Sequence, residues 1–311
     1  MAQRIMFMGT PSFAVPCLQA LVGHYEIVAV VTQPDRPARR GRRIVASAVK
    51  KAALAYDLPL MQPESLRQEE VIAEIRELQP QVIVVAAYGQ IIRPQVLSIP
   101  PSGVINVHPS LLPKYRGASP IAGALLAGEE KTGVTIMLMD EGMDTGPILA
   151  QISIKIRPED TTSSLVERLA RMGADLLLET LPRWLEGQIK PQPQDNARAT
   201  YTKPIAKKDG LIDWSLPAVE IWGRVRAFDP WPGAHTWWRG KLFKVLASRP
   251  LPAWAGKGKP GEVLDLSAGV AVATGQGALL LQEVQLAGRR AIGIQDFVRG
   301  QRNFIGSLLG Q

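Results

Sequence analysis

The chain has 311 residues, of which 46% are hydrophobic and 21% are charged, a composition typical of a globular protein large enough for two buried cores. No apolar run approaches the roughly 18–20 residues of a membrane-spanning helix, and the first residues, MAQRIMFMGTP, lack the features of a signal peptide, so none is expected. The single cysteine excludes an intramolecular disulfide and fits a reducing compartment, which favours a cytoplasmic protein.

The net charge of +8 is distributed unevenly along the chain. Residues 1–204 hold 22 Lys and Arg against 20 Asp and Glu, whereas residues 205–311 hold 14 against 8. A basic second part indicates a polyanionic partner, and a surplus of charge for solubility is the alternative.

The first part of the chain alternates between predicted strands and predicted helices. Short apolar runs predict strands at residues 4–9, 26–33, 58–62, 81–89, 103–108 and 133–140. Helical periodicity predicts helices at residues 11–24, 46–57, 68–79 and 162–187. This alternation favours a Rossmann-like, doubly wound, mainly parallel sheet, in which ligands bind at the carboxyl ends of the strands. The first turn, MGTPSF, lacks the G-x-G-x-x-G pattern, which argues against a nicotinamide cofactor.

The alternation of predicted strands and helices ends at a polar, proline-bearing stretch at residues 188–210, which we interpret as a linker. Beyond it, one helix is predicted at residues 218–228. Short strands separated by glycine-containing turns are predicted at residues 235–240, 241–248, 261–267, 269–275 and 278–286. This spacing is typical of a small antiparallel β-barrel, and an OB-like barrel is the preferred interpretation. The predicted organisation is therefore a Rossmann-like domain at 1–189, a linker at 190–206 and a barrel at 207–311.

One predicted strand ends in residues that can carry chemistry. Asn106 and His108 are two positions apart, so their side chains emerge on the same face of the strand. Pro109 disfavours a helical conformation at His108 and keeps the strand end open. Paired donors of this kind can stabilise an oxyanion, although an isolated histidine more often only caps a strand.

A carboxylate is expected at the same edge of the sheet. Asp144 follows the next predicted strand in a glycine-flanked loop, where it can orient the imidazole, raise its pKa or relay a proton. An ordinary turn is the alternative for Asp144 alone. Together with Asn106 and His108 it forms a candidate triad.

Metal and thiol chemistry are not expected. The three histidines and the cysteine stand far apart, without pairs at metal-ligand spacing, so no metal site is predicted. Cys17 lies in an apolar helix, where a core position is the preferred interpretation.

Several motifs together resemble the folate-dependent formyltransferase family. They are NVHPSLLPKYRGASPI and GVTIMLMDEGMDTGPIL, with FMGTPSFAVP, TQPDRPARRGRR, VIVVAAYGQIIRP, IDWS and RAFDPWPGAHT, in order and across nearly the full length. The Asn–His–Asp set marks the superfamily, whereas the full series resembles members that formylate methionyl initiator tRNA for translation initiation. The resemblance implies that 10-formyltetrahydrofolate donates a formyl group to the free α-amine of methionine on that tRNA.

The resemblance also implies roles for individual residues. Asn106 and a protonated His108 would hydrogen-bond the tetrahedral oxyanion, while Asp144 would stabilise the imidazolium and help proton transfer, with no covalent enzyme intermediate. The implied folate-binding residues are Ser110, Leu111, Leu112, Pro113, Ala87, Tyr88, Gly89 and Ile91. The alternative is that SLLP is a rigid connection and AAYGQII a strand end. HPS stands where some members have HGS; other members share it, which leaves the active site intact.

Residues 34–43 hold five arginines, whose positive charges repel one another and attract phosphates. The alternative is a solvated surface loop without a phosphate partner. The resemblance implies that this loop enters the tRNA acceptor stem and that lysines near the barrel contact the sugar–phosphate backbone. ARRG replaces the more usual AGRG, adding a charge in place of a glycine. The expected tRNA-binding residues are Arg36, Arg39, Arg40, Arg42, Arg43, Lys203, Lys207 and Lys208.

Other functions stay open at this point. A hydrolase of 10-formyltetrahydrofolate, or a formyltransferase acting on an amino sugar nucleotide, would share the triad but would not explain the arginine loop, the linker and the basic barrel together. A non-catalytic RNA-binding protein on a decayed scaffold is a third possibility, against which the intact triad argues. In the absence of an obvious dimer motif, a monomer is expected.

Overall fold

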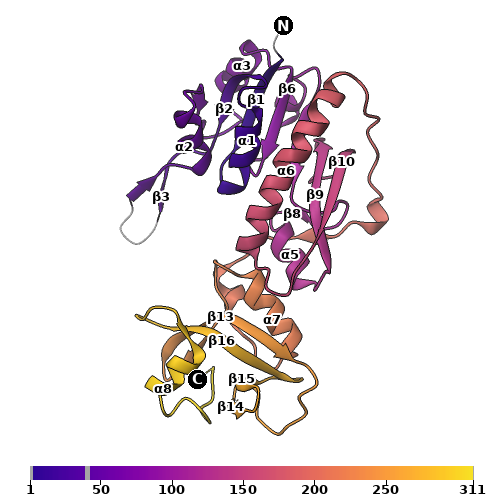
Figure 1. The fold of residues 1–311 in the computed structure, drawn as a ribbon. Coiled ribbons are helices and arrows are strands. Elements are labelled where there is room, and N and C mark those ends of the chain that lie inside the picture. The colour runs from indigo at the N-terminus through magenta and orange to yellow at the C-terminus, as the bar shows by residue number, and fades with distance from the viewer. Residues whose placement is uncertain (1–2, 39–42, 311) are drawn as a thin grey trace. The chain divides into compact units, whose positions relative to one another are not determined.

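The computed structural model describes residues 3–38 and 43–310, and its ribbon is drawn in Figure 1. The chain divides into two compact units. The first unit contains the residues up to Pro120, Lys131–Lys155 and Val166–Thr202; the second contains Ile121–Glu130, Ile156–Leu165 and the residues from Lys203 onward. Within the described residues, no helix is long and apolar enough to cross a membrane.

A seven-stranded sheet forms the centre of the first unit, in the order β10-β9-β7-β6-β1-β2-β5. Its strands are β1 (Arg4–Gly9), β2 (Glu26–Val31), β5 (Leu60–Met61), β6 (Val82–Ala86), β7 (Val104–His108), β9 (Lys131–Leu138) and β10 (Ile148–Lys155). The strands from β5 to β7 pair in parallel, while β9 pairs antiparallel with both β7 and β10. All residues of β6 and β7 are buried, which explains the continuous apolar sequence of β6, while β7 also buries the polar residues Asn106 and His108. The predicted Rossmann-like, mainly parallel sheet is confirmed.

Helices and short strands make up the rest of the described chain up to Thr202, and those at 121–126 and 162–165 belong to the second unit. They are η1 (Ser12–Ala14), α1 (Val15–Leu21), β3 (Arg36–Ala38), β4 (Arg43–Val45), α2 (Ala48–Ala55), α3 (Glu69–Glu77), α4 (Pro94–Leu97), β8 (Arg116–Gly117), α5 (Pro120–Leu126), α6 (Thr162–Leu185), η2 (Asn196–Arg198) and β11 (Tyr201–Thr202). Ser47 caps α2 by accepting a hydrogen bond from the backbone N–H of Lys50 at 2.9 Å. Gly173 lets α6 lie close to the sheet, because a Cβ there would stand 2.9 Å from Val107 of β7.

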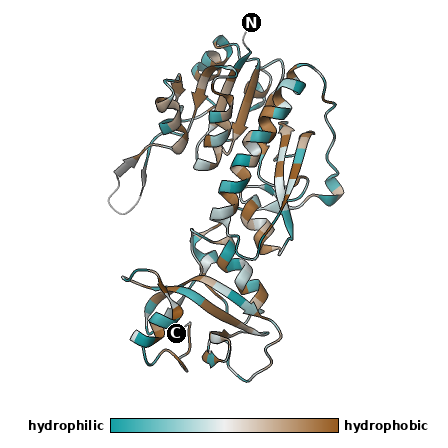
Figure 2. Ribbon diagram, viewed as in Figure 1, coloured by the Kyte–Doolittle hydropathy of each residue, from teal (hydrophilic) through white to brown (hydrophobic). Residues whose placement is uncertain are grey.

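The second unit contains a curled antiparallel sheet in the order β12-β13-β16-β15-β14, with β17 paired to β16. Its strands and helices are η3 (Lys207–Gly210), α7 (Ala218–Ala227), β12 (His235–Trp238), β13 (Lys241–Leu251), β14 (Val263–Leu266), β15 (Gly269–Ala273), β16 (Ala278–Leu286), β17 (Ile292–Gly293) and α8 (Ile294–Gly300). This half-barrel is consistent with the predicted OB-like fold. In Figure 2 its strands are largely brown, with hydrophilic residues mostly in the turns and on the helices.

An aromatic cluster fills the half-barrel. Trp238 and Phe243 come from neighbouring strands, while Phe297 from α8 and Phe304 beyond it pack against them with ring centroids 5.0–5.7 Å apart. Edge-to-face aromatic pairs contribute about 0.5–1.5 kcal/mol each beyond their buried area. The C-terminal segment is therefore part of the core of this unit.

Candidate active site

The three residues of the candidate triad converge at the carboxyl end of β7. Asn106 and His108 lie on β7 and are 9% and 4% exposed, and Asp144 lies in the loop between β9 and β10. The amide Nδ2 of Asn106 donates to Asp144 Oδ1 at 3.4 Å, and His108 Nδ1 lies 3.7 Å from the same oxygen. The sequence predicts that the strand before Asp144 ends at the same edge as β7, but β9 is antiparallel to β7 and ends beside its amino end, where Leu138 pairs with Ile105. The loop after β9 therefore turns back along β7 to bring Asp144 to Asn106 and His108.

The loop that carries Asp144 is held by segments far away in sequence. Asp144 has a left-handed backbone with φ 53°, and its Oδ2 accepts a hydrogen bond from the backbone N–H of Gly117 at 2.8 Å. The amide Nε2 of Gln194 donates to the carbonyl oxygens of Asp144 and Gly146 at 2.8 and 2.7 Å. A Cβ at Gly146 would stand 1.9 Å from the Leu138 carbonyl oxygen, so only glycine fits. The carboxylate is thus fixed by contacts to its side chain and its backbone.

Gln194 is itself oriented by a buried arginine. Arg116 is 1% exposed and donates from Nε and Nη2 to Gln194 Oε1 at 3.1 and 2.8 Å. Its remaining bonds go to Asn196 Oδ1 at 2.8 Å and to the hydroxyl of Tyr201 at 3.1 Å. Because Oε1 of Gln194 accepts from a guanidinium, its amide nitrogen faces the Asp144 loop. The sequence pattern predicts a linker at Gln194 and Asn196 and indicates no role for Arg116.

His108 is held in a defined orientation by the backbone. Its Nε2 lies 3.1 Å from the carbonyl oxygen of Tyr115, and because a carbonyl only accepts, Nε2 carries the proton. Burial lowers the pKa of His108, and the negative charge of Asp144 and the Tyr115 carbonyl only partly oppose this. The pKa of the ring is therefore below that of an exposed histidine, and its Nδ1 faces the carboxylate of Asp144.

Cys17 does not belong to this site. It is fully buried, and desolvation raises the pKa of its thiol to about 12, so the thiolate is negligible at neutral pH. Its predicted core position is confirmed. Among the described residues, no group of three or more His, Cys, Asp and Glu side chains is placed to hold a metal ion.

The segment SLLP, residues 110–113, is locked to the sheet through Thr135. The Thr135 hydroxyl donates to the Ser110 carbonyl at 2.7 Å and accepts from the backbone N–H of Leu112 at 3.2 Å. Gln151 Nε2 donates to the same hydroxyl at 2.8 Å and to the Leu112 carbonyl at 3.0 Å. Ser110 and Leu112 are buried, while Leu111 and Pro113 are half-buried. The segment is a rigid wall beside the triad strand.

The residues after β6 expose backbone at the same edge of the sheet. Ala87 and Gly89 are exposed and have φ of 46° and 90°. Tyr88 between them is buried in the core, and its carbonyl accepts from the Thr10 hydroxyl at 2.7 Å. Ile91 is 80% exposed. Ala87 and Gly89 thus offer backbone groups, whereas the ring of Tyr88 is a core side chain.

The predicted tRNA-binding residues lie on the surface where they are described. Arg36 is exposed and donates to Gln33 Oε1 at 3.2 Å, and Lys203, Lys207 and Lys208 are exposed. Arg39, Arg40 and Arg42 lie outside the described residues, and Arg43 is described only as backbone of β4.

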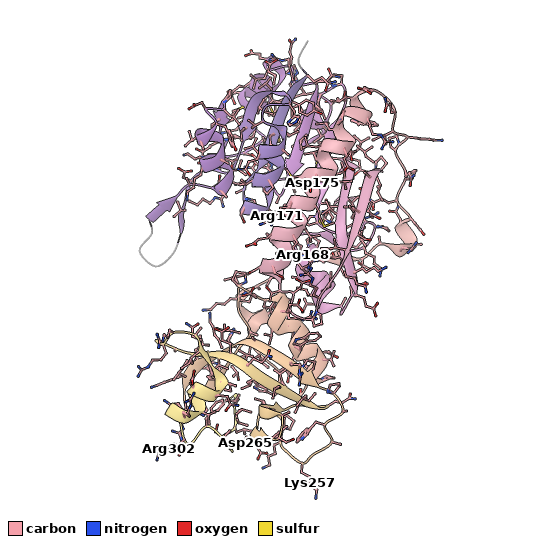
Figure 3. The ribbon with its side chains drawn as sticks, viewed as in Figure 1. Arg168, Arg171, Asp175, Lys257, Asp265 and Arg302 are labelled. Atoms are coloured by element: carbon pink, nitrogen blue, oxygen red, sulfur yellow. The ribbon has the colours of Figure 1, made fainter. Side chains whose placement is uncertain are left out.

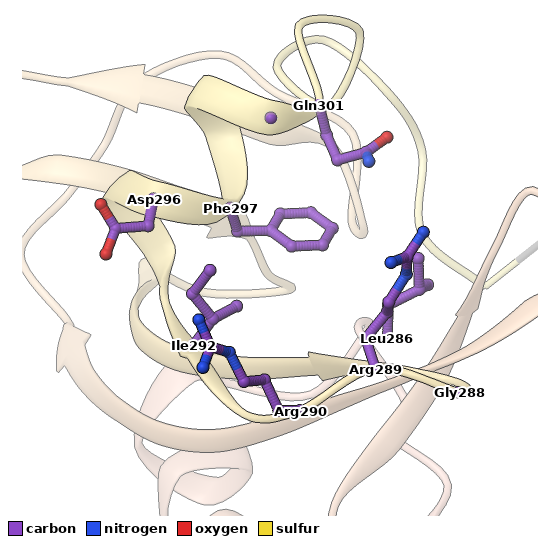
Figure 4. Close-up of a pocket in the computed structure, with 9 residues that line it drawn as sticks. Leu286, Gly288, Arg289, Arg290, Ile292, Asp296, Phe297 and Gln301 are labelled. Carbon is purple, nitrogen blue, oxygen red and sulfur yellow. The ribbon is translucent and has the colours of Figure 1, made fainter.

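Further basic residues surround the half-barrel. Lys257 and Arg302 project from its loops in Figure 3. Arg289 and Arg290 line a cavity of about 530 Å³ beside Phe297 of α8, which Figure 4 shows. The basic charge of the second part of the chain therefore lies on several exposed loops.

Comparisons with known proteins agree with this geometry. A family model described as formyl transferase matches residues 3–181, and one described as formyl transferase, C-terminal domain, matches residues 204–302. The chain is 52% identical to a protein named methionyl-tRNA formyltransferase from Roseiflexus castenholzii, with 100% of both chains covered. It is 55% identical to the protein of that name from Chloroflexus aurantiacus, over 92% of this chain and 93% of the relative.

Two solved structures have a similar fold. One is an N-formyltransferase from Helicobacter canadensis in complex with folinic acid and dTDP-3-aminofucose, at TM-score 0.69 and 19% identity, with 91% of this chain and 99% of that chain covered. The other is HypX from Aquifex aeolicus in complex with tetrahydrofolic acid, at TM-score 0.63 and 19% identity, with 98% and 48% covered.

Proposed function

The chain belongs to the formyl transferase family, and from this premise we propose that it transfers the formyl group of 10-formyltetrahydrofolate to the α-amino group of methionyl initiator tRNA. The observation that carries the proposal is the identity of 52% and 55%, over 92% or more of this chain, to two proteins named methionyl-tRNA formyltransferase. The convergence of Asn106, His108 and Asp144 supports it, because formyl transfer needs an oxyanion donor and a proton carrier at one point.

Asn106 is the proposed oxyanion donor. Its Nδ2 already donates to Asp144 Oδ1 at 3.4 Å, a long bond that leaves the amide able to turn toward a stronger acceptor. The oxygen of the formyl group becomes negative as the amine adds to the carbon, so a donor there stabilises the transition state more than the substrate.

His108 and Asp144 are the proposed proton carriers. The amine that adds to the formyl carbon must lose a proton, and the nitrogen that leaves must gain one. Neutral His108 takes the first proton, with Asp144 3.7 Å from its Nδ1 stabilising the imidazolium, and returns it to the leaving nitrogen, through water where needed. One proton is thus moved and none is consumed, and no covalent enzyme intermediate forms.

The donor site is proposed to lie between the SLLP wall and the residues after β6. Ser110, Leu111, Leu112 and Pro113 would form one side, and Ala87, Tyr88, Gly89 and Ile91 the other. The residues fit a folate-derived donor, because the exposed backbone of Ala87 and Gly89 can pair with a ring that has hydrogen-bonding edges. When bound, the donor supplies the activated formyl group; the protein contributes orientation and the exclusion of water.

The tRNA is proposed to contact basic residues on both parts of the chain. The residues assigned to it are Arg36, Arg39, Arg40, Arg42, Arg43, Lys203, Lys207 and Lys208. Exposed lysines and arginines bind phosphates without reading sequence, so they would position the acceptor end rather than select it. We also propose that residues 190–206 connect a domain at 1–189 to one at 207–311 while bonding to the first through Gln194, and that the protein is a monomer acting in the cytoplasm, where charged tRNA is available.

The test offers the purified protein 10-formyltetrahydrofolate with charged initiator or elongator tRNA. Formyl-methionyl-tRNA should form on initiator tRNA in preference to elongator tRNA. Release of formate without transfer would instead identify a hydrolase, and transfer to an amino sugar nucleotide would identify that class of formyltransferase. Either result, or equal formylation of both tRNAs, would refute the proposal.

A further inference from the structure

The strands β3 and β4 form a two-stranded sheet of their own, in which Arg36 pairs with Val45. In Figure 1, β3 extends beyond α2 and away from the seven-stranded sheet. A two-stranded ribbon by itself is only marginally stable in water. Its place relative to the sheet therefore depends on the residues at which it begins. We call residues 33–36 the loop base.

Asp35 ties the loop base to two other segments of the first unit. Its Oδ2 accepts a hydrogen bond from Nζ of Lys50 on α2 at 2.7 Å, and its Oδ1 accepts from Nε2 of Gln62, just after β5, at 2.9 Å. The bonds from Lys50 and then Gln62 lower the pKa of the Asp35 carboxyl, so this group is charged at neutral pH. Both carboxylate oxygens are thus engaged by groups outside the loop base.

Gln62 and Gln33 extend this network to Arg36. The same Nε2 of Gln62 donates to the carbonyl oxygen of Gln33 at 3.1 Å, and Oε1 of Gln33 accepts from Nη2 of Arg36 at 3.2 Å. Arg36 is exposed, and its guanidinium is oriented by a neutral amide. Because Asp35 pairs with Lys50, the positive charge of Arg36 stays available to a phosphate.

The loop base is also bonded to the edge of the sheet at which the formyl donor is proposed to bind. The backbone N–H of Gln33 donates to the hydroxyl of Thr10 at 3.4 Å, and that hydroxyl donates to the Tyr88 carbonyl at 2.7 Å. Thr10 follows β1 and Tyr88 follows β6, two neighbouring parallel strands. Arg36 is therefore held at a defined place relative to this edge.

We propose that Asp35 and Gln62 are positioning residues, which hold Arg36 and a tRNA phosphate bound to it at a fixed place relative to the formyl donor. This inference rests on the proposed function. Formyl transfer requires the α-amine of methionine to lie within reach of the formyl carbon, and a small displacement of a bound substrate lowers the rate strongly. The two residues therefore act on the rate of transfer more than on the affinity for tRNA.

Two simpler interpretations of Asp35 make different predictions. If Asp35 acts only as a negative charge among arginines, its removal should strengthen the binding of a polyanion and leave the rate of transfer unchanged. If Asp35 and Gln62 only support the fold, their loss should lower the rate by the same factor whether or not Arg36 is present. A positioning role predicts a lower rate that depends on Arg36.

The test measures single-turnover formylation of methionyl initiator tRNA by the full-length protein at saturating tRNA, together with tRNA affinity. Gln62→Met removes the amide donors without changing any charge, so the rate should fall about tenfold or more while the affinity stays within a factor of about two. Asp35→Asn should lower the rate similarly, although the loss of a negative charge favours tRNA binding. Gln68→Met and Asp57→Asn, exposed residues outside the network, are the matched controls and should keep the wild-type rate.

A double-mutant cycle with Arg36→Gln separates positioning from support of the fold. If Gln62 and Asp35 act through Arg36, then Gln62→Met and Asp35→Asn should change the rate of the Arg36→Gln protein by no more than about twofold. An equal loss of rate in both backgrounds would overturn the proposal, as would a wild-type rate in Gln62→Met, or tighter tRNA binding at a wild-type rate in Asp35→Asn. Failure of the wild type to formylate the tRNA would instead refute the proposed function, so the two failures are distinguishable.

Discussion

At the scale of single residues, the proposed chemistry depends on a histidine, His108, that is buried beside a carboxylate. His108→Ala removes the proton carrier and should lower the rate of formyl transfer about a hundredfold or more, in the range seen for loss of one active-site donor. Affinity for tRNA should stay within a factor of about two, because His108 is 4% exposed and lies among protein groups. Single-turnover formylation and tRNA binding measure the two effects. A loss of tRNA affinity equal to the loss of rate would contradict the assigned role.

The neutral state of His108 also predicts how stability depends on pH. The unfolded chain binds a proton on this ring below about pH 6.5, whereas burial lowers the pKa of His108 in the folded protein, so the folded ring stays neutral to lower pH. The folded state is therefore favoured above pH 6.5 and loses this contribution as the pH falls. The free energy of unfolding, measured with denaturant, should decrease between pH 7.5 and pH 5.5. The decrease should be smaller for His108→Gln than for the wild type, by up to about 1.4 kcal/mol per pH unit. The exposed His24→Gln is the matched control.

The sequence predicts that Asn106, His108 and Asp144 lie close together, but it does not predict the protonation state of His108. Asn106 and His108 share a face because of the two-residue period of a strand, and Asp144 follows the strand that pairs with theirs. The protonation of His108 depends instead on its burial and on the Tyr115 carbonyl, neither of which a linear pattern encodes. The direction of the pKa shift of His108 therefore follows from the packing around the ring, which the spacing of the motifs does not predict.

At the scale of elements, the stretch after α6 is part of the active site. The β11 strand pairs in parallel with β8, and Gln194 reaches the loop of Asp144 from the same stretch. The polar, aperiodic sequence of residues 188–210 predicts a linker. Their bonds run to residues about 50 to 85 positions away, such as Arg116, and long-range pairing of two-residue strands leaves no periodic signal.

This arrangement makes Gln194 a positioning residue. Gln194→Glu keeps an acceptor for Arg116 but removes the amide N–H groups that hold the carbonyls of Asp144 and Gly146. We expect the rate of formyl transfer to fall about tenfold or more and its pH profile to shift, with KM for tRNA unchanged, because the carboxylate loses its fixed place beside His108. Gln192→Ala, an exposed neighbour whose contacts to Ile148 are through the backbone, is the control. An unchanged pH profile with reduced stability would indicate a structural role alone.

Other elements differ in how well local sequence predicts them. The strands β1 and β7 and the helix α6 match their predicted ranges to within two residues, because long apolar runs and strong periodicity are local signals. The edge strand β10 was not predicted, since its outer residues are mostly exposed and it follows a glycine-rich loop. The short helix α8 was not predicted either. Its core residue Phe297 packs against Trp238 and Phe304, and such contacts between distant residues leave no helical period in the sequence.

At the scale of the whole molecule, positive charge is the feature on which the proposed contact of both parts of the chain with tRNA depends. Residues 205–311 carry a net charge of +6, and the loop at 34–43 carries five arginines. Binding of a polyanion by such residues releases counterions, so affinity should fall steeply with salt concentration. The residues proposed to bind the formyl donor carry no charge, so the affinity for the donor should depend far less on salt concentration.

Replacing Arg40 and Arg42 by alanine tests this separation. Each phosphate contact that is lost should reduce the slope of log affinity against log salt concentration by about one. The double variant should therefore bind tRNA more weakly and with a slope smaller by about two. Its affinity for folate should stay unchanged. Lys207→Ala with Lys208→Ala is the comparison, because these exposed lysines test the second part of the chain in the same way. If the arginine variant instead lost folate affinity at constant salt slope, the loop would serve the donor site, and the basic charge of the second part would be the main contact to tRNA.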